Sequence, residues 1–469
     1  MPLGLTGTRS PLKSGQLIFA AIVIAAVIIL TRAFSDRETI ESRDNPAVAG
    51  FFEFVAPYID PEQSATRVMD FERLFAAVYA RIVQSYVDEP DEAVLIDGAI
   101  SAVMDLNPVP REEPAERLAQ AAIGGMLATL DPHSHLLSAE AFGRIKGRTK
   151  GRFAGLGMEL TMDRGLVKVV SPIDDTPAQR AGIRAGDVIT HVDGHSLRGL
   201  TLADAVARMR GKSGTKVAIT LRRQNGRTLG LTLSRETIRL PTAQSRTEGN
   251  VGYVRITAFN EQTGEQLRRA ISDLGRQGES GWLDLVLDLR SSPGGFLSQA
   301  VSVADTFLAE GPIVSTRGRI EKLDQRFGAK PGDIGESAAL VVLIDGGSAG
   351  SSEVVASALQ HHRRAVVMGA HSFGKGTVQT IIPLPQGTAL RLSTHRYHTP
   401  SGASFDGTGV QPDVTIVAEG QEREAGRSGQ VLDAADCPAA GDRDDRVLGC
   451  ALMLLRAGGL DAFLAEMRR

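Results

Sequence analysis

Residues 340–384 read LVVLIDGGSAGSSEVVASALQHHRRAVVMGAHSFGKGTVQTIIPL, and their pattern is the clearest indication of the fold class. It opens with Leu340–Ile344, which is apolar at every position, as expected of a strand covered on both faces of its sheet. A turn of glycines and serines follows, and then an apolar periodicity typical of a helix. A second apolar run, Ala365–Met368, predicts another buried strand. This order of strand, helix and strand predicts an α/β domain.

Serines and a lysine frame this unit. Ser348, Ser351 and Ser352 lie at or before the start of the predicted helix, and Lys375 follows the second strand between two glycines. The spacing suits a Ser–Lys hydrolase, in which an amine replaces histidine as the general base. Two ordinary alternatives stay open. Serines before a helix commonly cap its N–H groups, and a lysine between glycines is commonly a solvated cation.

The glycines around Lys375 also resemble a phosphate-binding loop. That motif needs Ser or Thr directly after the lysine to hold magnesium, and a helix after it. Gly376 stands there instead, and Thr377–Ile382 has the pattern of a strand. We therefore reject a nucleotide site at this position.

The composition predicts a packed protein of several domains. The chain has 469 residues, enough for two or three domains, and 42% of them are hydrophobic. The formal net charge is −3, so nothing favours nucleic acid as a partner. Neither the nine histidines nor the two cysteines show a metal-ligand spacing, and we expect no metal.

An apolar segment near the N-terminus predicts a location outside the cytoplasm. Leu17–Leu30 is uninterrupted and follows Arg9 and Lys13. It is shorter than the ~20 residues that span a bilayer comfortably, and it fits a secretory signal or a short signal anchor. Because Thr31–Ala33 is a poor cleavage site, we expect residues 1–35 to remain as an anchor.

The two cysteines, Cys437 and Cys450, both lie near the C-terminus. In an oxidising compartment they would pair and close a short loop, worth ~3 kcal/mol in the chain-entropy model. Two free buried thiols are the alternative, and the sequence leaves both open.

Changes in composition divide the protein into six segments. The expected boundaries are 1–35 (anchor), 36–66 (polar linker), 67–147 (helical region), 148–236, 237–420 (alternating strands and helices) and 421–469 (helical tail). The tail is expected to end in one helix, Asp445–Glu466. Two apolar stripes carry the helical region: Phe71, Leu74, Phe75 and Val78, and Ala119, Ala122, Met126 and Leu127.

Segment 148–236 resembles a PDZ domain. Its signals are the run Ala181–Ile189, an amphipathic helix at Leu202–Met209, and the residues Leu156, Gly157 and Met158 at the position of the carboxylate-binding loop. Such domains receive the C-terminus of another polypeptide as an added strand, while loop N–H groups hold its carboxylate. The alternative is a PDZ fold that serves only as a spacer.

A glycine turn follows another buried strand. Leu285–Leu289 ends in Arg-Ser-Ser-Pro-Gly-Gly, which exposes the N–H groups of Gly294 and Gly295 at the carboxyl end of the strand. An oxyanion would be stabilised there. A purely structural turn is the commoner use of Pro-Gly-Gly.

Together these motifs resemble the carboxy-terminal processing peptidases of the tail-specific serine protease family, over roughly residues 67–416. The matching motifs are Asp131–Ser134, the PDZ segment, Leu287–Gly295, Gly347–Glu353 and Ser372–Gln379. The resemblance implies a Ser–Lys dyad on a crotonase-like α/β peptidase core, with an inserted PDZ domain, a helical N-terminal region and no cofactor.

The same resemblance implies roles for individual residues. Lys375 would be the general base, Gln379 would position it, and Gly294 or Gly295 would lie near the oxyanion. A lysine base requires a pKa lowered by burial. The partners implied by the resemblance are C-terminal tails of extracytoplasmic proteins. The expected anchor adds the bacterial inner membrane, and a second copy or an adaptor protein is a further candidate partner. The implied location of the domains is the periplasm, anchored or secreted.

One departure from the family pattern bears on activity. The family motif Ser-Ala-Ser-Ala-Ser-Glu places its nucleophile where this protein has Gly350, and His361 stands where the family has an acidic residue. Ser351 is the expected substitute if the helix begins one residue later, and Ser348 is a second candidate. The alternatives are a tail-binding scaffold without catalysis, and a core that binds a small apolar ligand.

Overall fold

The computed structural model describes residues 45–149, 152–163, 166–172, 176–184, 186–200, 202–223, 225–239, 242–277, 284–334, 338–417, 430–441 and 444–467. They form two compact units, one containing 45–142, 318–321 and 379–395, and the other containing the rest. The expected anchor, 1–35, lies outside the described residues. Among the described residues, no single helix is long and apolar enough to cross a membrane. One pair of helices, Arg446–Ala457 and Leu460–Met467, is long and apolar enough when taken together, but it is bent by 114°.

The first unit is helical, as predicted. Its helices are α3 (Pro46–Val55), η1 (Ala56–Tyr58), α4 (Ala65–Ser85), α5 (Glu92–Met104) and α6 (Ala115–Ala128). Both predicted apolar stripes are buried in one core. Strand β1 (His135–Leu137) then pairs with β18 (Ala389–His398) in antiparallel register.

The segment predicted as a polar linker folds in part as helix α3. Asn45 caps this helix through its side chain, and Pro46 occupies the first position, where its missing N–H is not needed. Val48, Phe51 and Val55 are buried, and Phe51 stacks on Phe75 with ring centroids 4.2 Å apart. The prediction was wrong here because the apolar spacing of residues 48–55 outweighs the polar residues before them.

Helix α7 (Ala139–Thr149) contains the boundary between the two units, which falls after Phe142. The PDZ segment follows this helix in the second unit. That segment comprises β2 (Arg152–Gly155), β3 (Met158–Asp163), β4 (Leu166–Pro172), α8 (Pro177–Arg180), β5 (Val188–Val192), β6 (His195–Ser196), α9 (Leu202–Met209), β7 (Lys216–Arg222), β8 (Thr228–Ser234) and β9 (Glu236–Arg239). The sheet order is β3-β4-β5-β7-β8, so β3 is an edge strand. Helix α9 has the predicted bounds.

The core is a seven-stranded sheet of order β10-β11-β12-β15-β16-β19-β20, and only the β10–β11 pair is antiparallel. From residue 243 to residue 417 the chain contains β10 (Ala243–Glu248), β11 (Val251–Ile256), α10 (Thr263–Gln277), β12 (Asp284–Asp288), α11 (Leu297–Asp305), β13 (Pro312–Gly318), η2 (Glu321–Leu323), β14 (Gln325–Gly328), β15 (Leu340–Ile344), α12 (Ser351–His361), β16 (Val366–Gly369), β17 (Thr377–Pro383), η3 (Pro385–Gly387), β18 and β19 (Val414–Val417). Of these, η3 and most of β17 and β18 belong to the first unit, and β17 pairs with β18 outside the seven-stranded sheet. The strands and helices predicted here are confirmed within a few residues.

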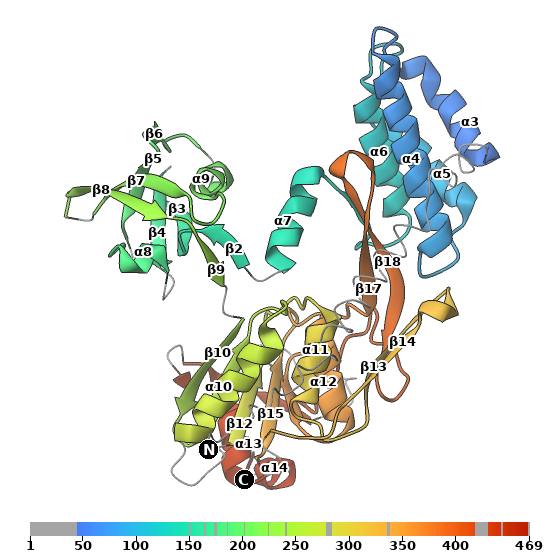
Figure 1. Ribbon diagram of the computed structural model, residues 1–469. Coiled ribbons are helices and arrows are strands. Elements are labelled where there is room, and N and C mark those ends of the chain that lie inside the picture. The colour runs from blue at the N-terminus through green and yellow to red at the C-terminus, as the bar shows by residue number, and fades with distance from the viewer. Residues whose placement is uncertain are drawn as a thin grey trace, which may run out of the picture. The chain divides into compact units, whose positions relative to one another are not determined.

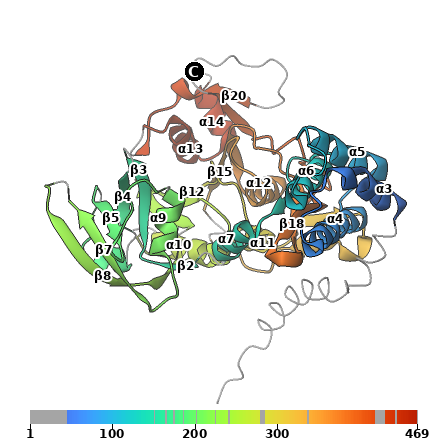
Figure 2. The same cartoon turned by 90° about the horizontal axis from the view of Figure 1, so that it is seen from above.

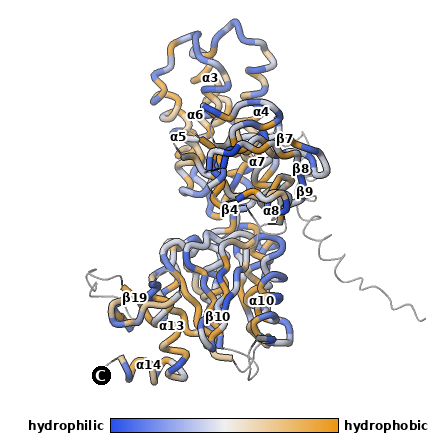
Figure 3. Tube along the Cα trace, turned by 90° about the vertical axis from the view of Figure 1, so that its left-hand side faces the viewer, coloured by the Kyte–Doolittle hydropathy of each residue, from blue (hydrophilic) through white to orange (hydrophobic). Residues whose placement is uncertain are grey.

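Helices cover both faces of this sheet. Alternate strand residues such as Leu287 and Val342 pack on α10, α11 and α12, while Val286 and Val341 pack on helices of the C-terminal segment. The two helical layers lie on opposite sides of β12 and β15 (Figures 1 and 2). Apolar stretches, orange in Figure 3, gather between α10 and α13. Burial on both faces explains why these strands are apolar throughout.

The C-terminal segment is part of the core sheet rather than a separate tail. It contains β20 (Gln430–Asp433), η4 (Ala434–Asp436), α13 (Arg446–Ala457) and α14 (Leu460–Met467). The single helix predicted from Asp445 to Glu466 is wrong. Gly458 ends α13 in a left-handed conformation, with φ 81°, and α14 begins after Gly459. Cys437 and Cys450 form a disulfide.

Candidate active site

Three loops meet at the carboxyl edge of the core sheet. Strands β12, β15 and β16 are adjacent and parallel, so the segments that follow them emerge at the same edge. These segments carry the glycine turn around Gly294, the serine turn around Gly350, and Lys375. The topology therefore brings together three motifs that lie far apart in the sequence.

The glycine turn packs directly on the start of α12. A Cβ atom on Gly294 would lie 2.5 Å from the carbonyl oxygen of Ala349 and 2.8 Å from the nitrogen of Ser351, and one on Gly295 would lie 2.1 Å from the oxygen of Phe259. Among the described residues, the N–H groups of Gly294, Gly295 and Ser351 donate to no acceptor. Unpaired N–H groups at the start of a helix are the usual donors to a developing oxyanion.

Gly350 occupies a turn in which a side chain at this position would have free space. Its backbone has φ 55° and ψ −105°, a left-handed conformation that glycine adopts without strain. A Cβ atom built there would meet nothing within 4 Å. The sharp turn between strand and helix is the arrangement that exposes a nucleophile in hydrolases of the elbow type. The position expected for the family nucleophile is therefore open.

The three serines of this turn are all buried. Ser348 Oγ donates to Leu289 O at 2.9 Å, and Ser352 Oγ donates to Ser292 O at 3.0 Å. Ser351 is 2% exposed, and its Oγ has no hydrogen-bond partner. Ser351 was expected to replace the nucleophile only if the helix began one residue later. Helix α12 instead begins at Ser351, so this condition is not met. The hydroxyl groups of Ser348 and Ser352 are therefore engaged in hydrogen bonds to the backbone. The hydroxyl of Ser351 is the one in this turn that makes no hydrogen bond, and we call it uncommitted.

Glu353 joins the serine turn to the lysine loop. Its carboxylate is fully buried and accepts from Gly350 N at 2.8 Å, Gly374 N at 2.6 Å and Lys375 N at 2.9 Å. Ser372 Oγ also donates to it, at 2.6 Å. Burial raises the pKa of Glu353, and these hydrogen bonds oppose the rise. Four donors from two loops converge on one side chain, which fixes both loops together.

Lys375 lies in the loop between β16 and β17 and is partly exposed. Strand β17 begins at Thr377, so Lys375 lies outside it. The alternation of side chains along a strand therefore does not place Lys375 and Gln379 on the same face. Gln379 lies on β17 in the first unit, where its Oε1 accepts from Arg391 at 3.3 Å. The strand predicted after Lys375 is confirmed.

The PDZ segment presents the loop expected to hold a carboxylate. Gly157 has φ 77°, and a Cβ atom there would lie 2.3 Å from Thr176, whose Oγ1 donates to Gly157 O at 2.9 Å. Leu156 is buried, and Met158 begins the edge strand β3. Helix α9 packs in the same core as this strand. An edge strand next to a glycine loop is the arrangement that accepts a peptide by strand addition.

Comparisons with known proteins agree with this geometry. The model of peptidase family S41 matches residues 250–416, and that of a PDZ domain matches residues 168–223. A carboxy-terminal-processing protease of Bartonella bacilliformis is 44% identical over 344 residues, which cover 73% of this chain and 74% of that protein. This chain belongs to peptidase family S41. It is a homologue of carboxy-terminal-processing proteases, and its class is that of serine peptidases.

The chain is also similar to two other proteins. A protein named "Probable CtpA-like serine protease" from Staphylococcus epidermidis is 33% identical over 308 residues, covering 65% of this chain and 62% of that protein. Among solved structures, a photosystem II D1 C-terminal processing protease covers 82% of this chain and all of its own, with 27% identity and a TM-score of 0.47.

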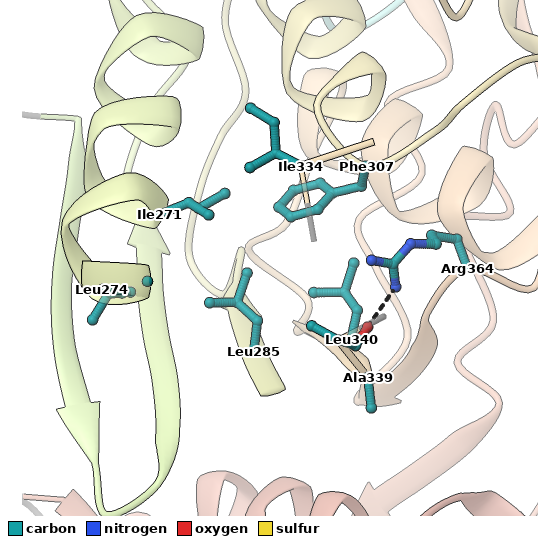
Figure 4. A pocket seen from close by; sticks show the side chains of 10 residues that line it. Ile271, Leu274, Leu285, Phe307, Ile334, Ala339, Leu340 and Arg364 are labelled. Atoms are coloured by element: carbon teal, nitrogen blue, oxygen red, sulfur yellow. Dashed lines mark hydrogen bonds between the residues drawn. The ribbon is translucent and has the colours of Figure 1, made fainter. Parts of the chain in front are cut away.

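One pocket of the core bears on the alternative that this domain binds a small apolar ligand. A pocket between α10 and the ends of β12 and β15 is lined by Ile271, Leu285, Phe307 and Leu340, and Arg364 donates to Ala338 O at 3.0 Å (Figure 4). Its cavity volume of about 20 Å³ holds roughly one water molecule. Among the described residues, no group of three or more His, Cys, Asp or Glu side chains is arranged to hold a metal ion.

Sequence reasoning missed the role of Glu353. The signal was present, because a Glu at the third position of a helix commonly reaches back to the N–H of the cap residue. What the pattern did not reveal is that the same carboxylate also accepts from the loop 372–375. That contact depends on the adjacency of β15 and β16 in the sheet.

A first prediction concerns capture of a C-terminal tail by the PDZ segment. Peptides with a free, apolar C-terminus should bind at least about tenfold more tightly than their C-terminal amides, because amidation removes the charge that loop N–H groups stabilise. Fluorescence anisotropy of a matched peptide pair measures the ratio. Equal affinities would show that binding does not use a terminal carboxylate.

Proposed function

We propose that this protein is an envelope endopeptidase that binds C-terminal tails through its PDZ domain and cleaves them with Ser351 as nucleophile and Lys375 as general base. The observation that carries the proposal is the uncommitted hydroxyl of Ser351, at the start of a helix that Glu353 ties to the lysine loop. The N–H groups of Gly294 and Ser351 would receive the oxyanion. The core is proposed to be crotonase-like.

The reaction would proceed by acyl transfer. Lys375 takes the proton of Ser351 Oγ as the oxygen bonds to the scissile carbonyl carbon, and the protonated lysine then returns a proton to the leaving amine. Water subsequently hydrolyses the acyl-enzyme. Attack requires the Ser351 side chain to leave its buried position.

The proposed location is outside the cytoplasm, with residues 1–35 as anchor. The disulfide between Cys437 and Cys450 supports it, since such bonds persist in oxidising compartments. Sedimentation of the full-length protein with membranes after a salt wash is the expected result, and recovery of a shortened soluble form as the main species would contradict the anchor.

A second candidate function is a tail-binding scaffold without catalysis. The observation that favours it is Gly350, which takes the turn position with room for a side chain but carries no hydroxyl, while the Ser351 side chain stays buried. In this case the PDZ domain alone would carry the function, and the peptidase core would be a binding surface.

Gly350→Ser decides between the two. The new side chain has room, although the positive φ of this sparsely populated backbone conformation costs a non-glycine residue about 1–3 kcal/mol. If Ser351 is the nucleophile, the natural protein cuts a bound tail peptide, and Gly350→Ser changes kcat by less than about tenfold. If the protein is a scaffold, the natural protein binds without cutting and Gly350→Ser begins to cut. Gly350→Ala, which adds the strain without the hydroxyl, is the control.

A further inference from the structure

Arg290 joins the glycine turn of the active site to the C-terminal segment. Its guanidinium donates to both carboxylate oxygens of Asp445, at 3.0 and 2.6 Å, and to those of Asp288, at 3.0 and 2.6 Å. Asp288 is fully buried and also accepts from Tyr253 Oη at 2.6 Å. Because the guanidinium is held by two carboxylates in bidentate geometry, Arg290 has little freedom to move.

Asp445 reaches this position as the cap residue of α13. Its Oδ1 accepts from Leu448 N at 3.0 Å, so one carboxylate both caps the helix and pairs with Arg290. Burial acts to raise the pKa of Asp445, but the hydrogen bonds from Arg290 hold it below its usual value. The disulfide from Cys437 to Cys450 closes the segment that contains Asp445. This segment lies beyond residue 416, where the match to the family ends.

The loop that follows Arg290 is tied to the catalytic turn. Ser291 has φ 54°, a strained conformation for a serine, and its N–H donates to Asp345 Oδ1 at 2.7 Å. The carbonyl of Ser292 accepts from Ala349 N at 3.0 Å. Gly294 then packs on Ser351. A displacement of Arg290 would therefore be passed to the N–H groups of this turn through only a few residues.

We propose that Asp445 is a positioning residue for the peptidase: through Arg290 it fixes the loop 291–295, whose glycine N–H groups receive the oxyanion. The C-terminal segment would then contribute to catalysis by holding this loop in place. This inference rests on the proposed function, and it adds a residue that lies outside the family region.

Asp445→Asn tests it, because asparagine still caps a helix but removes the charge and the bidentate pair. With the full-length protein and a tail peptide, kcat should fall at least about tenfold while KM stays within about twofold, since the oxyanion contacts act only in the transition state. Asp445→Glu, which keeps the charge, should retain more of kcat. Asp433→Asn is the matched control: Asp433 caps η4 in the same segment and makes no contact with Arg290 among the interactions described.

Hydrogen exchange of the amides in 289–296 gives a readout that needs no cleavage. Exchange should accelerate at least about tenfold in Asp445→Asn and stay unchanged in Asp433→Asn. Unchanged exchange and unchanged kcat in Asp445→Asn would overturn the proposal, as would equal effects from Asp433→Asn. If the natural protein cuts no peptide, the proposed function fails, yet faster exchange in Asp445→Asn alone still establishes the coupling to the loop.

Discussion

Replacing Lys375 with alanine is expected to lower kcat for cleavage of a tail peptide by at least about 10³-fold, because the serine loses the base that accepts its proton. Ser351→Ala should be equally damaging, and the double variant should be no worse than either single one, since members of a dyad act as a unit. Lys375→Arg should not restore activity, because a guanidinium does not give up its proton at working pH. Single-turnover measurements of the acylation rate provide the comparison.

The controls for this experiment separate chemistry from charge and folding. Lys330→Ala removes an exposed lysine from the same unit and should leave kcat unchanged. Peptide affinity should stay within about twofold in every variant, because the PDZ domain is untouched. Cleavage that survives Lys375→Ala would exclude this lysine as the base. Loss with Lys375→Ala but not with Ser351→Ala would move the nucleophile to another residue.

Glu353→Gln is expected to have the second-largest effect, a loss in kcat of about 10²-fold. The amide provides one acceptor oxygen where the carboxylate provides two, and its NH₂ group would face N–H donors of Gly350 or of the lysine loop. The two loops should then shift apart, and a displacement of about 1 Å is enough for a loss of this size. Steady-state kinetics together with thermal unfolding measure both consequences.

The stability change in this variant should be smaller than the activity change suggests. Unsatisfied donors cost about 1–3 kcal/mol each. The folded state raises the pKa of Glu353, so the folded protein binds its proton more tightly than the unfolded chain does. In the natural protein, ionisation of Glu353 therefore lowers the free energy of unfolding as the pH rises through its folded pKa. Glutamine does not ionise, so the variant avoids this decrease at neutral pH.

Gln360→Ala is the matched control on the same helix. Gln360 donates to Gln411 O and to Asp413, both at 2.9 Å, and it makes no contact with the lysine loop among the interactions described. It should lower stability and leave kcat within about twofold. Equal losses of kcat in Gln360→Ala and Glu353→Gln would show that Glu353 acts only through stability of the helix.

The order of elements and the identity of most candidate residues could be predicted from the amino-acid sequence. Strands buried on both faces, such as Leu340–Ile344, are apolar throughout, and this pattern depends only on neighbouring residues. The motifs around Gly294, Gly350 and Lys375 were likewise visible, because each is confined to a short run of residues. The absence of a serine at position 350 was also a fact of the sequence.

Which of these groups come into contact could be learned from the folded structure alone. The start of α12 at Ser351 and the burial of its hydroxyl follow from packing against the glycine turn, which belongs to a different strand and loop of the sheet. The four hydrogen bonds to Glu353 depend on β15 and β16 being neighbours, and the pairing of Arg290 with Asp445 depends on α13 covering the sheet. Such contacts join residues that are distant in the sequence, and no local pattern of hydrophobicity specifies a partner at that distance.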